Sequence, residues 1–324
     1  MSKNKYEFQL VSYEKNPVAD NTVLFERPFV NTKHSFSEDA KRFVPGEQLE
    51  IAINTAIAVG QPLLITGEPG TGKTQAAYYA AYKLKVEPLI HFQVKSDTTA
   101  GTLLYHFDSV KYFYEATVAT RTGEGGGNNS EGKQGSLDKS RYVEPRALWE
   151  AMASDRPRVL LIDEIDKAPR DFPNDLLHEL DKMEFKVTET GEMISAEKKN
   201  RPIVFITSNS ERRLPEPFLR RCVYHHIRFD DSIVAKAVEK RRDDYHNLSD
   251  KFLEMAIARF LELRERNLRK RPSTGELLVW LRVLALAVGI YPEKLDVALA
   301  RLPYLGVLLK DHQDIEDLMA QSQS

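Results

Sequence analysis

A glycine-rich segment beginning at Gly67 has the residue types and the spacing that phosphate binding requires. Residues 67–74 fit the pattern GxxxxGK[ST] without exception. Glycines let the backbone turn its N–H groups toward phosphate oxygens. Lys73 would place its charge on the β- and γ-phosphates, and the Thr74 hydroxyl would bind Mg²⁺. The segment predicts a nucleotide phosphate site whose binding residues are Gly67, Glu68, Pro69, Gly70, Thr71, Gly72, Lys73, Thr74 and Gln75.

Two acidic residues follow an apolar run further along the chain. Residues 159–162 read Val-Leu-Leu-Ile, and Asp163 and Glu164 come directly after them. A buried strand that ends in carboxylates suits a magnesium site beside a sheet edge, so we expect Asp163 to hold the ion through water. Glu164 would polarise the attacking water as a general base. An apolar strand ending in acids is common by itself, but the pair after a phosphate loop favours hydrolysis over mere nucleotide binding.

Two further segments carry polar side chains that fit the same reaction. Residues 203–209 are an apolar run that ends at Asn209, whose amide could orient the attacking water. The alternative is a turn-forming asparagine. Residues 214–222 include the adjacent Arg220 and Arg221, and either could neutralise a phosphoryl group bound by a neighbouring subunit. The alternative for these arginines is a solvated basic pair or a structural ion pair.

Short apolar runs alternate with helical patterns and must position these residues. Strands are expected at residues 62–66, 88–94, 158–162 and 202–207, and helices at residues 46–59, 73–84, 145–152 and 173–183. This alternation predicts a parallel sheet covered by helices on both faces. From residue 232 onward only helical patterns remain, notably at residues 250–264 and 273–290. We therefore expect an α/β domain at residues 46–231 and a smaller helical domain at residues 232–324.

Three segments do not follow this alternation of strands and helices. Residues 1–45 form a polar N-terminal extension whose role the sequence does not indicate. Residues 120–140 are rich in glycine and polar residues, cannot bury a core and are expected to be mobile, either as a surface insertion or as a loop that touches a ligand. Residues 179–194 alternate between apolar and polar side chains, which predicts a hairpin.

Composition excludes several classes of protein. The 324 residues include 46 basic and 48 acidic side chains, so the net charge of -2 does not indicate nucleic-acid binding. Cys222 is the only cysteine, which excludes an internal disulfide and a cysteine metal site. We expect it to be a small buried hydrophobe, although the arginines before it leave a reactive thiol possible. No leader segment or membrane span is evident, so we expect a cytoplasmic protein with no membrane partner.

The order of the segments GEPGTGKT, LLIDEID, ITSN and LPEPFLRRC resembles the AAA+ superfamily. The segments GEPGTGKT and DEIDKA are most similar to those of the MoxR-like and dynein-related ATPases. The resemblance covers roughly residues 45–310. This resemblance implies an α/β nucleotide domain with a helical lid, ATP with Mg²⁺ as the bound nucleotide, and a homo-hexameric ring with its sites between subunits. It also implies that Asn209 is sensor 1, and that Arg221 matches the arginine finger better than Arg220 does.

The chain departs from the family at the second sensor. Relatives often carry an arginine at the start of a lid helix, where this sequence has Thr274 or Gly275. Arg271 is near enough to contact nucleotide instead, and a basic residue before a helix N-terminus is the alternative. The whole basic stretch at residues 264–271 is expected to form a solvated face or a ring contact.

The leading hypothesis is an ATPase that remodels or activates a partner protein. By resemblance, such a client or effector often carries a von Willebrand factor A domain. A nucleotide-gated assembly module that recruits an effector is a second hypothesis. A nucleic-acid motor related to the McrB-type GTPases is a third, against which the DEID pattern and the balanced charge both count.

Overall fold

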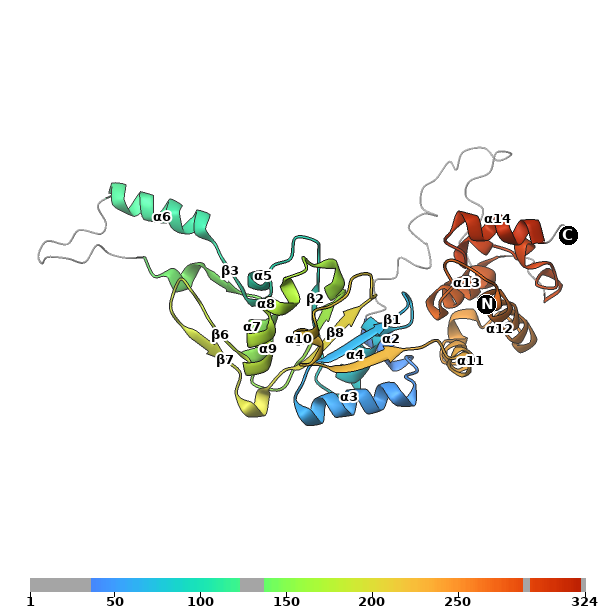
Figure 1. Ribbon diagram of the computed structural model, residues 1–324, viewed down its shortest axis with the longest axis horizontal. Coiled ribbons are helices and arrows are strands. Elements are labelled where there is room, and N and C mark those ends of the chain that lie inside the picture. Colours follow the sequence, from blue (N-terminus) through green and yellow to red (C-terminus); the bar gives the residue numbers. More distant parts are fainter. Residues whose placement is uncertain (1–35, 123–136, 288–291, 322–324) are drawn as a thin grey trace, which may run out of the picture. The chain divides into compact units, whose positions relative to one another are not determined.

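The computed structural model describes residues 36–122, 137–287 and 292–321 (Figure 1). These residues form two compact units, each of which is described by itself. The sheet unit contains residues 47–67 and 80–227. The loop-and-lid unit contains residues 68–79 together with the described parts of residues 1–46 and 228–324. The second unit therefore combines the glycine-rich loop with the C-terminal helices.

A five-stranded parallel sheet forms the centre of the sheet unit, in the order β2-β5-β8-β1-β9. The predicted parallel sheet is confirmed. Its strands are β1 (Leu63–Gly67), β2 (Ile90–Gln93), β5 (Val159–Asp163), β8 (Ile203–Ser208) and β9 (Val223–Ile227). All five residues of β1 and of β5 are buried, whereas burial alternates in the edge strands β2 and β9. Continuous apolar runs are required in the central strands because both faces of the sheet are covered.

Helices cover the sheet between these strands. They are α3 (Glu47–Val59), α4 (Lys73–Leu84), α5 (Ala100–Leu104), α7 (Ala147–Met152), α8 (Phe172–Asp175), α9 (Leu177–Lys182) and α10 (Glu216–Leu219), with 3-10 turns at η2 (Ile165–Lys167) and η3 (Lys198–Asn200). The helix expected at residues 173–183 is two short helices, which meet at the fully buried Leu176. The core beneath the helices includes Leu160, Ile162, Ile206 and Phe172.

Two insertions extend from the sheet unit. Strands β3 (Tyr105–Phe107) and β4 (Val143–Pro145) pair antiparallel, and α6 (Ser109–Thr122) projects beyond them (Figure 1). The 3-10 turn η1 (Lys139–Tyr142) leads back into β4, while most of the glycine-rich insertion expected at residues 120–140 falls outside the described residues. The second insertion is the hairpin of β6 (Glu184–Lys186) and β7 (Met193–Ser195), which confirms the predicted hairpin from residue 184 onward. Residues 179–182, which the prediction also included, belong to α9 instead.

The C-terminal part of the loop-and-lid unit, from residue 228 onward, is called the lid, and its described residues contain helices and turns but no strand. Its helices are α11 (Asp231–Glu239), α12 (Asp250–Glu265), α13 (Thr274–Leu286) and α14 (His312–Gln321), with 3-10 turns at η4 (Arg242–Tyr245), η5 (Pro292–Lys294), η6 (Leu299–Arg301) and η7 (Leu305–Val307). Ser273 caps α13 in a capping box with Glu276, as the residue types at those two positions favour. Tyr245, Phe252, Phe260 and Trp280 fill the lid core.

The N-terminal helix α2 (Phe36–Lys41) leads into a segment that is joined to the lid by charge pairs. Asp244 accepts hydrogen bonds from Arg42 at 2.8 Å and from Arg282 at 2.6 Å. The two arginines lower the pKa of Asp244 against the opposing effect of its burial. Residues 1–35 of the expected extension lie outside the described residues.

No helix in the described part of the chain is both long and apolar enough to cross a membrane.

The indole of Trp280 gives a test of lid packing. Its ring is fully buried, and its Nε1–H donates to the carbonyl of Pro303 at 2.7 Å. The Trp280→Phe variant leaves that carbonyl without its donor, so we expect a loss of about 1–3 kcal/mol in the free energy of unfolding. Urea denaturation measures it. Val279→Ala changes the neighbouring, 47% exposed side chain and is expected to stay within about 0.5 kcal/mol of wild type; equal losses in the two variants would contradict the prediction.

Candidate nucleotide site

The glycine-rich loop follows β1 directly, and its glycines adopt a backbone that other residues disfavour. Gly70 has φ +76° and Gly72 has φ +90°. A Cβ atom on Gly70 would lie 2.2 Å from Ser273 Oγ, and one on Gly72 would lie 2.7 Å from Phe43 Cε2. Both positions are therefore closed to side chains by conformation and by space. The result is a tight backbone cradle of the kind that holds phosphate groups.

Lys73 lies at the end of this cradle and begins α4. Its residue is 7% exposed, and its ammonium donates to the carbonyl of Glu68 at 2.9 Å. Thr71 Oγ1 donates to the same carbonyl at 2.8 Å. The positive N-terminal end of a helix and the lysine charge both favour an anion at this position. The loop therefore fits the phosphates of a nucleotide, with the residues predicted from the sequence.

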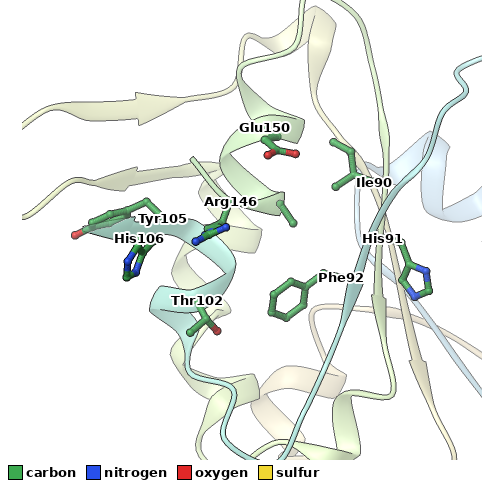
Figure 2. Close-up of a pocket in the computed structure, with 9 residues that line it drawn as sticks. Ile90, His91, Phe92, Thr102, Tyr105, His106, Arg146 and Glu150 are labelled. Atoms are coloured by element: carbon green, nitrogen blue, oxygen red, sulfur yellow. The ribbon is translucent and has the colours of Figure 1, made fainter. Parts of the chain in front are cut away.

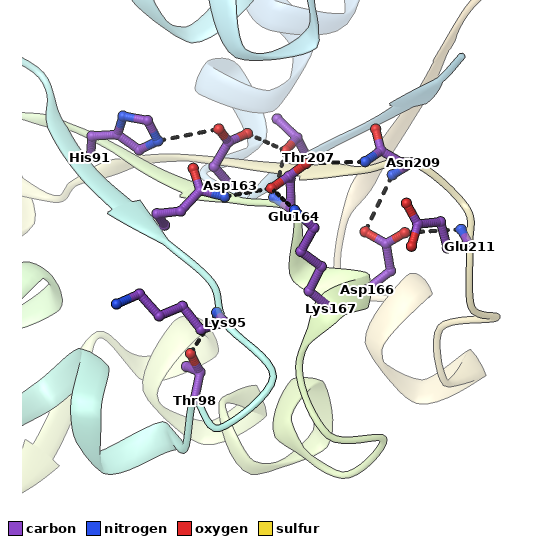
Figure 3. A network of polar contacts seen from close by, with 11 residues as sticks. His91, Lys95, Thr98, Asp163, Glu164, Asp166, Lys167, Thr207, Asn209 and Glu211 are labelled. Carbon is purple, nitrogen blue, oxygen red and sulfur yellow. Dashed lines mark hydrogen bonds and ion pairs between the residues drawn. The ribbon is translucent and has the colours of Figure 1, made fainter. Parts of the chain in front are cut away.

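Asp163 is held at the carboxyl end of β5 by partners from both neighbouring strands. Thr207 Oγ1, from β8, donates to Asp163 Oδ1 at 2.5 Å, and His91 Nε2, from β2, lies 3.2 Å from Oδ2 (Figure 3). The aspartate is 5% exposed. These contacts fix the direction of a buried carboxylate, which is the arrangement that a metal-holding group requires. Neither partner was identified from the sequence.

Glu164 has a strained backbone, and its side chain accepts three hydrogen bonds. Its φ of +61° is left-handed, a conformation that non-glycine residues adopt at a cost of about 1–3 kcal/mol. Its Oε1 accepts from Asn209 Nδ2 at 3.2 Å, so the structure brings together two residues that the sequence singled out. Its Oε2 accepts from Gln93 at 2.6 Å and from Lys167 at 2.5 Å. Sequence reasoning missed the last two donors.

Asp166 has a positioning role that the sequence did not reveal. It is 3% exposed and accepts from the backbone N–H groups of Asn209 at 3.2 Å and Glu211 at 2.9 Å (Figure 3). The carboxylate thereby holds the loop that carries the Asn209 amide. The second aspartate of the DEID segment is the signal that could have identified it.

The side chains of the candidate site also indicate how Mg²⁺ could be bound. Within the described ranges, no group of three or more His, Cys, Asp or Glu side chains could hold a metal ion by itself. Asp163, in the sheet unit, and Thr74, in the loop-and-lid unit, each offer a hard oxygen of the kind that Mg²⁺ prefers, and a nucleotide-bound Mg²⁺ takes its remaining ligands from phosphates and water. The residues present therefore fit a nucleotide-bound Mg²⁺ and do not fit a metal cage made of protein alone.

The two candidate finger arginines follow α10, and each has a partner within the chain. Arg221 donates from Nε to Asp181 at 2.5 Å and from a terminal nitrogen to the carbonyl of Pro217 at 3.0 Å. Arg220 donates to Glu216 at 2.5 Å, and its side chain is 76% exposed. The neighbouring Cys222 is largely buried, which raises the pKa of its thiol to about 12. A reactive thiolate near neutral pH is excluded by that pKa.

The basic stretch at residues 264–271 is not uniformly solvated, which corrects the expectation from the sequence. Arg271 is exposed, and its side chain makes no hydrogen bond or ion pair that involves the described residues. Arg264, in contrast, is 8% exposed. It is buried because it packs on an aromatic ring and donates to a backbone carbonyl, contacts that no local sequence pattern predicts.

A cavity of about 480 Å³ lies beside the edge strand β2, and its lining residues include His91. Figure 2 shows Ile90 and Phe92 directed toward it, with Arg146, the N-cap of α7, and Glu150 of α7 opposite, while the ring of His91 lies on the other side of β2. The lining residue His91 also contacts Asp163, so the cavity adjoins a partner of that carboxylate.

The phosphate cradle, the paired carboxylates and the parallel sheet define a P-loop ATPase. Residues 62–222 match the family model of the AAA domain, dynein-related subfamily. This segment is therefore a AAA domain of the dynein-related subfamily, which makes the chain an ATPase.

Comparison with other proteins adds two similar solved structures. No curated protein sequence matches the chain. One structure is a candidate ATPase from Cytophaga hutchinsonii ATCC 33406, 13% identical, with 88% of this chain and 92% of that chain covered and a TM-score of 0.40. The other is the closed state of Hsp104 with ATPγS and FITC-casein, 20% identical, with 67% of this chain and 39% of that chain covered and a TM-score of 0.39.

The loop glycines can be tested with a control of the same backbone type. Gly70→Ala is expected to weaken ADP binding at least about tenfold, because the new methyl group needs a shift of about an ångström in the lid cap or the loop. Gly191 has φ +78°, and a Cβ added there would meet nothing within 4 Å, so Gly191→Ala carries the backbone strain without the clash. We expect unchanged ADP affinity in that control, measured by titration with a fluorescent ADP. Equal affinities in the two variants would show that the cradle does not need Gly70.

Proposed function

We propose that the chain hydrolyses ATP with Mg²⁺ at the interfaces of a homo-oligomeric ring and uses this cycle to remodel or activate a partner protein. The observation that carries the proposal is the arrangement around Glu164. A carboxylate at the end of a central strand is oriented by Asn209 and lies beside a buried, separately anchored Asp163. A general base, a water-orienting amide and a metal-holding group are the parts that phosphoanhydride hydrolysis requires.

Each residue has a defined task in this proposal. Lys73 and the loop backbone bind the phosphates, and Asp163 and Thr74 hold Mg²⁺, which would neutralise charge on the transferred phosphoryl group. Asn209 orients the attacking water, and Glu164 accepts its proton. Glu164 Oε2 already accepts from Gln93 and Lys167, whereas Oε1 accepts only from Asn209, so Oε1 is the oxygen that can accept the proton of the attacking water.

The ring interpretation depends on an arginine that reaches a neighbouring subunit's phosphate. Arg220 and Arg221 are both bound to carboxylates at partly or fully exposed positions. Exposed ion pairs contribute about 0–1 kcal/mol, so a nucleotide phosphate could take the place of either carboxylate. The family resemblance favours Arg221. It also supports a hexamer, and a client or effector that contains a von Willebrand factor A domain.

Subunit mixing tests both the chemistry and the ring. We expect Glu164→Gln to lower ATP turnover at least about 100-fold, and Arg221→Ala to do so about 1000-fold. A mixture of the two inactive variants should regain activity, because an Arg221→Ala subunit next to a Glu164→Gln subunit forms one complete site. The measurement is steady-state phosphate release across a range of protein concentrations. Lys199→Ala, at a side chain that is also 76% exposed, is the control that should remain active.

Other outcomes would favour other functions or another finger. If Arg221→Ala stays active and Arg220→Ala does not, the finger is Arg220. Two inactive variants that fail to complement each other would argue against a shared site. Negligible turnover in an assembled ring would favour the nucleotide-gated assembly module. A preference for GTP, or hydrolysis stimulated by duplex DNA, would favour the McrB-like motor.

A further inference from the structure

Arg264 is the buried member of an otherwise exposed basic stretch, and it lies in the last turn of α12. Its guanidinium carbon is 3.5 Å from the centre of the Phe229 ring, so the cation rests on an aromatic face. One terminal nitrogen donates to the carbonyl of Pro272. Burial lowers the pKa of Arg264 and the nearby Glu68 carboxylate opposes this shift, but an arginine stays charged in either case. A buried permanent cation therefore lies within the loop-and-lid unit.

The other terminal nitrogen of Arg264 points at the phosphate loop. It lies 3.5 Å from Oε2 of Glu68, the residue that follows the last residue of β1. Glu68 is also the residue whose carbonyl accepts from Lys73 and Thr71. The guanidinium can bridge the lid and the loop because its donors form a planar, rigid fork. A lysine at this position would offer a single nitrogen and could not reach both groups in the same way.

The contact with Pro272 leads to the same loop by a second route. Pro272 precedes Ser273, the N-cap of α13, and Ser273 Oγ occupies the space against which a Cβ on Gly70 would collide. Arg264 therefore fixes the carbonyl next to a cap that packs on the loop, while its other nitrogen reaches Glu68. Arg264 thus joins Glu68 to the lid directly and holds the residue that precedes the cap on which Gly70 packs.

We propose that Arg264 is a positioning residue that ties the lid to the phosphate loop, so that nucleotide leaves only after the contact between Arg264 and Glu68 has broken. This role rests on nucleotide binding by the loop, as set out above. Arg264 acts through Glu68 and through the α13 cap, and it does not take part in the chemical step. The lid-to-nucleotide coupling is thereby assigned to the end of α12 instead of to Arg271 or the start of α13.

The dissociation rate of fluorescent ADP, measured by stopped flow on the full chain, tests this role. Glu68→Gln keeps the shape of the side chain and removes its charge, and Glu68 is half-exposed, so the fold should tolerate the change. We expect ADP to dissociate about two- to fivefold faster, which is the range for a partly exposed ion pair. Arg266→Gln removes an exposed arginine that pairs with Glu262 and should leave the rate unchanged.

The double variant Glu68→Gln/Arg264→Gln separates coupling from independent effects. If the two groups act as one tether, Glu68→Gln has no further effect on the rate once Arg264 is replaced. If Arg264→Gln does not fold by circular dichroism, Arg264→Lys serves instead. The same fold increase from Glu68→Gln in both backgrounds, or an unchanged rate in Glu68→Gln alone, would overturn the tether. A wild-type chain that does not bind ADP would instead refute the proposed function.

Discussion

The hydroxyl of Thr207 accepts a hydrogen bond from the Glu164 backbone N–H and donates one to the Asp163 carboxylate, and the placing of the acidic residues depends on these two bonds. Thr207 belongs to β8 and is 1% exposed, so its hydroxyl position is set by the sheet itself. Parallel pairing brings the carboxyl ends of β5 and β8 to one edge. Side chains that are far apart in the sequence therefore meet in a fixed geometry.

Burial separates the acidic residues of the DEID segment into fixed and exchangeable groups. Asp163 and Asp166 are almost fully buried, and each is held by two partners that would be costly to lose. Glu164 is more exposed, with 28% of its side chain accessible, and its donors come from three different segments. A group in this position can exchange partners with water at low cost. The proposed general base is thus the carboxylate that is best able to change its contacts.

In the loop-and-lid unit, burial likewise separates the fixed contacts of a charged group from an exchangeable one, and here the group is the Arg264 cation. Arg264 is held by an aromatic ring and a carbonyl, both of which satisfy a buried guanidinium, and only its third contact reaches a partly exposed carboxylate. The glycines of the loop permit this closeness, because any side chain at Gly70 would push the α13 cap away. The α13 cap packs closely on the phosphate loop, and one ion pair joins Arg264 to Glu68. The geometry of the loop therefore depends on the position of the lid.

The phosphate loop, the strands β1, β2, β5 and β8, and the pair of Asp163 and Glu164 were predictable from the sequence, because each depends on residues adjacent in the chain. Glycine spacing, continuous apolar runs and helical periodicity are local properties, and α4 has the bounds that its pattern predicted. The contact between Gln93 and Glu164 and the burial of Arg264 were not predictable. Gln93 and Glu164 are 71 residues apart, and Arg264 and Glu68 are 196 apart. Such contacts depend on strand order and helix packing, so only the tertiary structure decided which polar side chains meet.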